Sequence, residues 1–212
     1  VPTTRAPVLF VPELARGLVG HFVGAIRGGA QYRKSSFLLD AAGTRVFPSW
    51  FAISERPHLP RALGSAPFDG EGCATRDREL VAGGVVDGYV LNTYAARKLG
   101  LRTTGNAGGV HNLIVHPGPE GYAELLKRMG RGLVVTELMG QGVNGVTGDY
   151  SRGAAGFWVE DGVAQFPVNE LTIAGNLKDM YARLVAVGSD VDARGSIRTG
   201  SILVDEMTIA GE

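Results

Sequence analysis

The chain has 212 residues, of which 21 are basic and 21 acidic, so its formal net charge is zero. This balance gives no sign of a nucleic-acid or anionic-membrane partner, and no apolar run approaches the roughly 20 residues that span a bilayer. Glycine contributes 32 residues, about twice the usual share of roughly 7%, which indicates a turn-rich, largely β architecture.

The N-terminal region predicts a strand followed by a helix. Pro7–Val11 is a short apolar run. Pro12 and Glu13 suit the first turn of a helix, where proline loses no needed donor and a carboxylate meets the positive end of the helix dipole. Apolar residues then recur at every fourth position in one stripe, at Leu14, Leu18, Phe22 and Ile26. Gly28 and Gly29 are expected to end this helix.

The region from residue 31 to residue 116 predicts short elements between polar glycine loops. Ser36–Leu39 and Arg45–Phe47 are expected to pair, and Phe51–Ile53 is expected to form another strand. The further predicted elements are a hairpin of strands 78–81 and 85–91, a helix over 93–99 ended by Gly100, and a strand over 110–116.

The second half predicts more strands than helices, which favours an α+β fold with a mostly antiparallel, curved or barrel-like sheet and a few scattered helices. The predicted helices are 121–129 and 176–187, and the predicted strands are 133–135, 157–159, 164–168, 171–173 and a bulged 201–209. Residues 1–212 are treated as a single domain. Because the chain starts at Val1 without a methionine, we expect it to be a piece of a longer protein.

The stretch from Gly140 to Gly162 holds seven glycines and is the best candidate for a functional surface. Glycine at this density costs backbone entropy, which a chain seldom carries without a packing or binding reason. Its first part matches the dinucleotide pattern GxGxxG. That chemistry needs a helix to open at the third glycine, whereas glycines and no helical apolar spacing follow Gly145. A nucleotide site is therefore disfavoured.

A search for catalytic motifs is mostly negative. The sequence has no HExxH and no CxxC, and its single cysteine, Cys73, cannot form an internal disulfide, which fits a reducing compartment. We interpret Cys73 as a small loop hydrophobe rather than a nucleophile. For Asp149 and Arg152, a structural ion pair and a ligand-binding pair look the same from the sequence.

Several motifs resemble the PmbA (TldE) branch of the TldD/PmbA proteins, and the resemblance covers essentially the whole chain. The motifs are 7–10, 32–40 (YRKSSFLLD), 95–101 (AARKLGL), 135–142 (VTELMGQG), 148–158 (GDYSRGAAGFW) and 173–180 (IAGNLKDM). The resemblance implies the C-terminal half of such a protein, with the N-terminal half absent. It further implies a cytoplasmic metalloprotease system for small or unfolded peptides, historically called a modulator of DNA gyrase.

The resemblance also implies where a metal site has been lost. In the TldD branch, the helix after the first strand carries HExxxH, with two zinc-binding histidines and a glutamate that serves the attacking water. Matching this chain through residues 17–20 places Val11, Pro12 and Arg16 at those three positions. Valine and proline offer no lone pair to a metal and arginine stays protonated, so we expect no metal or other cofactor in this chain and zinc in a partner.

We therefore expect a subunit without metal that pairs with a TldD-like zinc subunit, or with a second copy of itself, closes a proteolytic chamber and holds substrate backbone. Glycine loops suit that last role because their exposed N–H and C=O groups can pair with an extended peptide. The predicted substrate contacts are Asn144, Asp149, Tyr150 and Arg152.

Two alternatives stay open. One is a self-sufficient metallopeptidase or thiol enzyme that uses Cys73 or the chain's histidines, which are His21, His58, His111 and His116. The other is a non-catalytic interaction module of the gyrase-modulator type.

Overall fold

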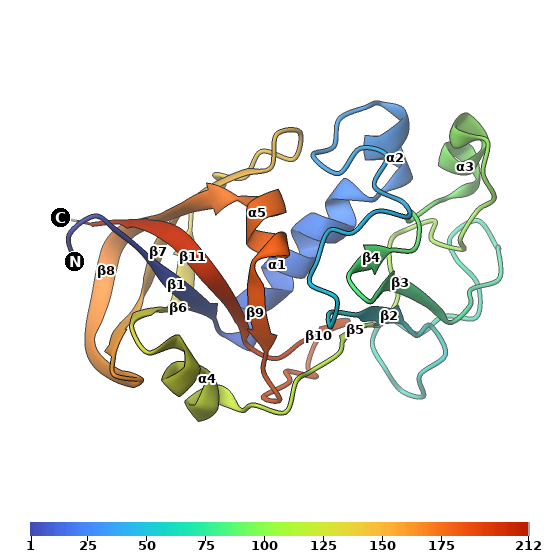
Figure 1. The fold of residues 1–212 in the computed structure, drawn as a ribbon. Helices are drawn as coiled ribbons and strands as arrows, with labels where there is room; N and C mark the ends of the chain where they lie inside the picture. Colours follow the sequence, from blue (N-terminus) through green and yellow to red (C-terminus); the bar gives the residue numbers. More distant parts are fainter. Residues whose placement is uncertain (212) are drawn as a thin grey trace. The chain divides into compact units, whose positions relative to one another are not determined.

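The computed structural model describes residues 1–211 and divides into two compact units (Figure 1). Unit 1 comprises Val1–Leu18, Pro117–Asp192 and the segment from Thr199 onward. Unit 2 comprises Val19–His116 and Ala193–Arg198. The chain thus leaves unit 1 within its first helix, α1 (Pro12–Ala25), and later returns to it.

The sheet of unit 1 closes on itself. Its strands are β1 (Thr4–Phe10), β6 (Gly132–Met139), β7 (Asp149–Glu160), β8 (Val163–Asn176), β9 (Leu184–Val187) and β11 (Ile202–Ala210). Their order is β1-β6-β7-β8-β11-β9, and β1 also pairs with β11. Five strands therefore form a ring, with β9 attached to β11. Only the β1–β6 pair is parallel, which confirms the predicted α+β class with a mostly antiparallel, barrel-like sheet.

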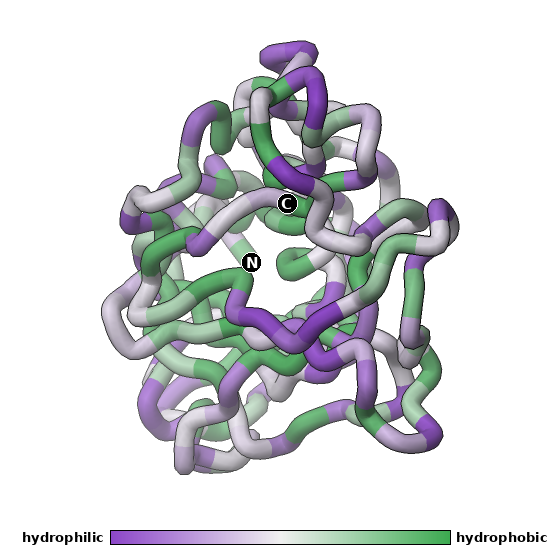
Figure 2. The backbone as a smooth tube through the Cα atoms, turned by 90° about the vertical axis from the view of Figure 1, so that its right-hand side faces the viewer, coloured by the Kyte–Doolittle hydropathy of each residue, from purple (hydrophilic) through white to green (hydrophobic). Residues whose placement is uncertain are grey.

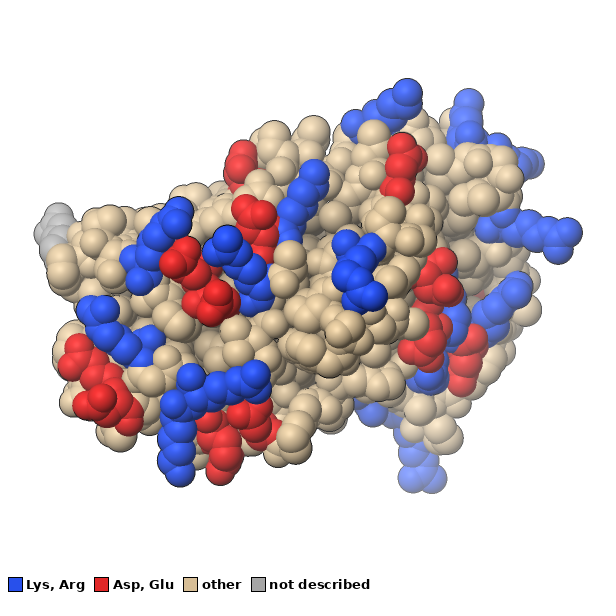
Figure 3. Space-filling model, in the orientation of Figure 1, with Lys and Arg blue, Asp and Glu red and all other residues tan. Residues whose placement is uncertain are grey.

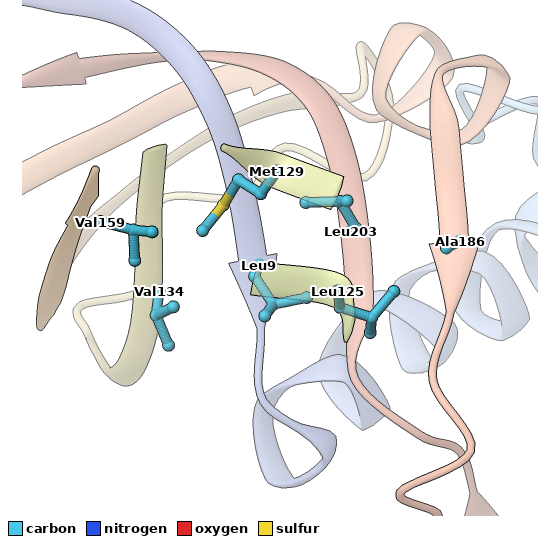
Figure 4. Close-up of a cluster of buried hydrophobic side chains, with 7 residues drawn as sticks. All are labelled: Leu9, Leu125, Met129, Val134, Val159, Ala186 and Leu203. Atoms are coloured by element: carbon cyan, nitrogen blue, oxygen red, sulfur yellow. The ribbon is translucent and has the colours of Figure 1, made fainter. Parts of the chain in front are cut away.

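The last three residues of strand β1 are buried on both faces. Val8, Leu9 and Phe10 are all inaccessible to solvent, and because successive side chains of a strand point to opposite faces, no side of this segment meets water. Leu9 belongs to a cluster in which α4 (Tyr122–Met129) covers the sheet. Figure 4 shows the cluster, which consists of Leu9, Leu125, Met129, Val134, Val159, Ala186 and Leu203. Burial on both faces explains the continuous apolar run at the start of the sequence.

The first and last segments of the described chain lie side by side in unit 1, as Figures 1 and 2 show. Thr4 in β1 lies opposite Ile209 in β11. A Cβ added at Gly211 would lie 2.7 Å from the Val1 carbonyl oxygen, so the backbones of the two terminal segments are in close contact. This proximity follows directly from the pairing of the first strand with the last.

Unit 2 is built on a smaller sheet with the order β10-β5-β2-β3-β4. Its elements are α2 (Gly28–Tyr32), β2 (Ile53–Glu55), β3 (Arg78–Ala82), β4 (Val85–Val86), α3 (Thr93–Leu99), β5 (Leu113–Val115) and β10 (Ile197–Arg198). As predicted, β3 and β4 form a hairpin, but β4 covers only the first two residues of the predicted strand 85–91. Also as predicted, α3 ends at Gly100, whose φ of 68° is left-handed. No helix in the described chain is long and apolar enough to cross a membrane.

Several predicted elements are wrong in type or in their bounds. Ser36–Leu39 forms turns, and Arg45 bridges to Val85 instead of pairing with it. The predicted helix 176–187 ends early, because α5 covers only Leu177–Ala182 and the remaining residues form β9 against β11. Strand β5 covers only part of the predicted strand 110–116. The predicted strands 164–168 and 171–173 are one strand, β8.

The packing of β1 predicts the effect of shortening a core side chain. Leu9→Ala should lower the free energy of unfolding by about 2–5 kcal/mol, because it leaves a cavity in the buried cluster. The matched substitution Leu63→Ala, at a leucine that is 78% exposed, should change it by no more than about 0.5 kcal/mol. Urea unfolding followed by circular dichroism measures both, and equal effects of the two substitutions would contradict the assignment of Leu9 to the core.

Candidate functional site

The glycine-dense stretch is only partly a loop. Residues 140–148 connect β6 to β7, whereas residues 149–160 are β7 itself. The predicted surface therefore consists of a short loop and the first residues of a strand. Because a strand rather than a helix follows the GxGxxG pattern, the geometry that cradles a pyrophosphate is absent here.

The loop is held by its own hydrogen bonds. The side-chain oxygen of Asn144 accepts from the backbone N–H groups of Val146 at 2.9 Å and Thr147 at 3.2 Å. Its backbone N–H donates to the Asp149 carbonyl oxygen at 2.8 Å. Asn144 thus shapes the loop in the way asparagine commonly shapes turns. The structure gives it this turn-forming role, and a substrate contact through its side-chain nitrogen stays a prediction.

Asp149 is exposed and is tied to its neighbours by hydrogen bonds. The Thr147 hydroxyl donates to Oδ2 at 2.6 Å, and the Asn176 side-chain amide donates to Oδ1 at 3.2 Å. These two bonds hold the pKa of the Asp149 carboxyl below its usual value, and the bond from Thr147 has the larger effect. Among the described residues Asp149 has no ion-pair partner, so the structural ion pair with Arg152 that the sequence allowed is not formed.

Tyr150 faces the interior of unit 1 rather than the solvent. Its side chain is 2% exposed, and burial raises the pKa of its hydroxyl to about 12, against the opposing effect of the Arg152 guanidinium. Alternation along β7 places Tyr150 and Arg152 on one face and Asp149 on the other. The four predicted contacts therefore do not share one surface: Asn144 lies beside Asp149, and Arg152 lies beside Tyr150.

Glycine is required where the loop approaches β7. The Ser151 N–H donates to the Gly142 carbonyl oxygen at 2.6 Å, and a Cβ added at Gly142 would lie only 1.7 Å from the Ser151 carbonyl oxygen. No side chain fits in that space. At Gly145, in contrast, an added Cβ would meet nothing within 4 Å.

The three positions that the resemblance matches to the metal motif of related proteins lie at the junction of β1 and α1. Val11 links the two elements, Pro12 opens the helix, and Arg16 lies one turn further on. A guanidinium nitrogen of Arg16 lies 3.5 Å from a carboxylate oxygen of Asp192, whose side chain is only 6% exposed. None of the three side chains has a lone pair available to zinc, so these residues do not fit the metal that the resemblance implies for related proteins.

Three histidines form hydrogen bonds with groups outside the loop of residues 140–148 and the start of α1. His58 bonds to Thr75 at 2.9 Å and His116 to Ser54 at 2.6 Å. Both ring nitrogens of His111 face backbone carbonyl oxygens, at 3.2 and 3.0 Å. Within residues 1–211, none of the histidines belongs to a group of three potential metal ligands.

One group of potential ligands does occur, and it consists of Asp69, Glu71 and Cys73. Burial acts to raise the pKa of Asp69, but three backbone N–H donors outweigh it and lower the pKa. The donors are those of Ala107, Cys73 and Glu71. The carboxylate of Asp69 thus organises its own loop.

Sequence reasoning missed Thr147 and Asn176 as partners of Asp149. Asn176 is 27 residues away in the sequence, and it meets Asp149 because the two are paired across β7 and β8. The asparagine also caps α5 by accepting from the Lys178 N–H at 3.1 Å. An asparagine before a helix is a recognisable cap signal, but nothing in the sequence joins it to Asp149.

Known proteins are similar in sequence to this chain over nearly its whole length. Residues 3–211 match the family model described as the PmbA/TldA metallopeptidase C-terminal domain. The chain is 55% identical over 210 residues to the metalloprotease PmbA of Escherichia coli O157:H7 and to the PmbA homolog of Haemophilus influenzae. Each match covers 99% of this chain and 47% of the relative, so the chain spans about half the length of the curated relatives it matches.

Solved structures show the same fold. A candidate modulator of DNA gyrase from Bacteroides thetaiotaomicron superimposes with a TM-score of 0.95 at 31% identity, over 100% of this chain and 48% of that one. TldE from Thermococcus kodakarensis gives a TM-score of 0.87 at 23% identity, over 100% of this chain and 51% of that one; an identity this low shows the fold alone.

The close approach at Gly142 predicts a local effect of a single methyl group. Gly142→Ala should destabilise the protein by about 1–3 kcal/mol because the loop must move away from Ser151. It should also speed hydrogen exchange at the Ser151 amide, which loses its acceptor. Gly145→Ala is the matched control and should leave that exchange rate unchanged. Equal protection of Ser151 in both variants would contradict the described loop geometry.

The hydrogen bonds to Asp149 predict a pH dependence. Because its folded pKa lies below the ordinary value of about 3.9, these bonds stabilise the fold above that value, and the contribution is lost as the pH falls through the folded pKa. Thr147→Val should raise the pKa of Asp149, whereas Thr147→Ser keeps the hydroxyl and should not. Carboxyl-carbon NMR titration measures both variants, and the same pKa in both would show that Thr147 is not the donor.

Proposed function

The chain belongs to the PmbA/TldA metallopeptidase C-terminal domain family, and on that premise we propose that it acts as the subunit without metal in a cytoplasmic zinc peptidase complex. In this proposal a TldD-like partner holds the zinc and cleaves small or unfolded peptides. This chain closes the proteolytic chamber and holds the backbone of the substrate.

The side chains at the start of α1 carry the proposal. Val11 and Pro12 offer no metal ligand, and Arg16 places a permanent positive charge where the resemblance implies a zinc-binding histidine. Since Arg16 is paired with the largely buried Asp192, its charge is compensated within unit 1. Because the paired guanidinium stays protonated, it offers no lone pair to a cation at this point.

A free strand edge in unit 1 supports the second role. Strand β8 pairs with β7 along nearly its whole length but with β11 only at Thr172–Ala174. Residues 163–171 therefore present one edge with no strand partner in the described chain. Val163 and Phe166 on this segment are 59% and 47% exposed. Extended peptides commonly bind by adding a strand to such an edge, with side chains filling nearby apolar surface.

The test is reconstitution with purified proteins. The chain freed of any affinity tag should contain no stoichiometric zinc by elemental analysis and should cleave no peptide alone. Addition of a zinc-bearing TldD-like protein should produce peptide cleavage greater than that of the partner by itself. About one zinc per chain, or an unchanged rate on mixing, would overturn the proposal.

A variant of Arg152 tests the substrate-holding role within that assay. Arg152→Ala should reduce kcat/KM of the reconstituted complex by roughly tenfold, as expected when a charged hydrogen-bond donor to substrate is removed. Arg102→Ala also removes an exposed arginine, but from unit 2, and should leave the rate unchanged. A rate for Arg152→Ala equal to that of the control would exclude Arg152 from substrate binding.

A further inference from the structure

Unit 2 contains a pocket of about 310 Å³ between α2, α3 and the glycine loop before β5. Its volume lies at the lower end of the range of roughly 300–1,000 Å³ that is usual for small-ligand sites. The lining includes two arginines, Arg27 and Arg33, and two asparagines, but no acidic residue.

Neither arginine of the pocket has a carboxylate partner within residues 1–211. Seven other arginines form ion pairs with carboxylates, whereas Arg27 and Arg33 form none with any residue in the described part of the chain. The nearby segments 27–34 and 94–102 hold three basic residues each and no acidic residue. Figure 3 shows basic side chains projecting from the end of unit 2 that carries α2 and α3.

Arg33 is held at the pocket by an aromatic neighbour. Its Nε donates to the Tyr32 hydroxyl at 3.1 Å, and its guanidinium carbon lies 5.2 Å from the centre of the Tyr32 ring. Tyr32 itself packs against the buried cluster around Ala95 on α3. These contacts reduce the conformational freedom that a surface arginine normally loses on binding a ligand.

Arg27 is positioned through its backbone. The Val90 N–H donates to the Ile26 carbonyl oxygen at 3.0 Å, and the Gly28 N–H donates to the Val90 carbonyl oxygen at 2.9 Å, so both neighbours of Arg27 are tied to Val90. Its guanidinium lies over Gly109, where an added Cβ would come within 3.4 Å of Nη2. The φ of +127° at Gly109 favours glycine there and keeps this wall free of a side chain.

A network of hydrogen-bonded polar side chains lies behind this pocket. Asn106 is 5% exposed, and its amide nitrogen donates to Glu55 at 2.8 Å and to the Gly109 carbonyl oxygen at 3.1 Å. Glu55 in turn forms an ion pair with Arg78, with 2.7 Å between Oε2 of Glu55 and Nε of Arg78. The carboxylate of Glu71 accepts from the Thr93 N–H at the start of α3, at 2.9 Å, and does not line the pocket.

We propose that this pocket binds a small ligand through an oxyanion, a carboxylate or phosphate group, held by Arg27 and Arg33. Planar guanidinium groups form paired, charge-assisted hydrogen bonds with both kinds of group. Tyr32, Val90 and Ala95 provide an apolar wall for the body of the ligand. The inference concerns unit 2 alone and does not depend on the proposed peptidase role.

NMR titration of the isotope-labelled chain tests this site at constant ionic strength. The probes are inorganic phosphate, the dipeptide Ala-Phe with a free carboxylate, and the same dipeptide as its C-terminal amide. Phosphate, the free dipeptide or both should shift the amide signals of Gly108 and Gly109 in a saturable manner, and the amidated dipeptide should not. Saturation by phosphate alone or by the free dipeptide alone identifies which oxyanion the site prefers.

Variants decide whether the arginines hold the anion. Arg27→Ala and Arg33→Ala should each weaken binding roughly tenfold or more, as expected for the loss of a charged hydrogen-bond donor. Arg27→Lys keeps the charge but loses the planar fork and should fall between Arg27→Ala and the unsubstituted chain. Arg76→Ala, which removes an exposed arginine elsewhere in unit 2, should bind like the unsubstituted chain. Absence of saturable shifts with both anions, or equal affinity in all variants, would overturn the proposal.

Discussion

Closure of the barrel by β1 is the constraint on which unit 1 depends. This strand is hydrogen bonded on both edges, in parallel to β6 and antiparallel to β11, and its residues 8–10 are buried on both faces. The side chains of Val8 and Phe10 point to one face of the sheet. The side chain of Leu9 points to the other face, where α4 packs on the sheet. Because the first strand joins the last, both ends of the described chain are fixed together, and α1 leaves from a rigid position.

The candidate site depends on that barrel rather than on its glycine loop alone. The loop of residues 140–148 is short, and its geometry is maintained from β7 by Asp149 and Ser151 and from β8 by Asn176. A glycine-dense segment normally loses much conformational entropy on folding. Here the register of β7 and β8 supplies the hydrogen bonds that offset this loss, which explains why a flexible sequence has a defined conformation.

Charged side chains in different parts of unit 2 differ in whether they have an oppositely charged partner. Glu55 is almost fully buried and pairs with the largely buried Arg78, and Asn106 hydrogen bonds to both side chains. A buried pair of this kind is tolerated only when its remaining hydrogen bonds are made. Arg27 and Arg33 line a pocket together with Asn106 of this network, but they form no ion pair with a carboxylate of the network. The charges of Glu55 and Arg78 therefore stabilise the fold, whereas those of Arg27 and Arg33 are available to bind an anion. This difference does not depend on the roles proposed for unit 1.

The sequence by itself determined those features that depend on neighbouring residues. The helix that opens at Pro12, the end of α3 at Gly100 and the buried strand at residues 7–10 follow from local torsional preferences and apolar patterning. The family resemblance, carried by long motifs, was likewise correct. Only the tertiary structure decided that residues 184–187 are a strand, that Tyr150 is buried, that Asp149 pairs with Thr147 and Asn176, and that Arg27 and Arg33 converge on one pocket. The strand β9, the bond from Asn176 and the pocket depend on the pairing or packing of segments far apart in the chain, and such contacts leave no periodic signal in a single sequence. The bond from Thr147 is local, but it needs the loop conformation that β7 and β8 impose.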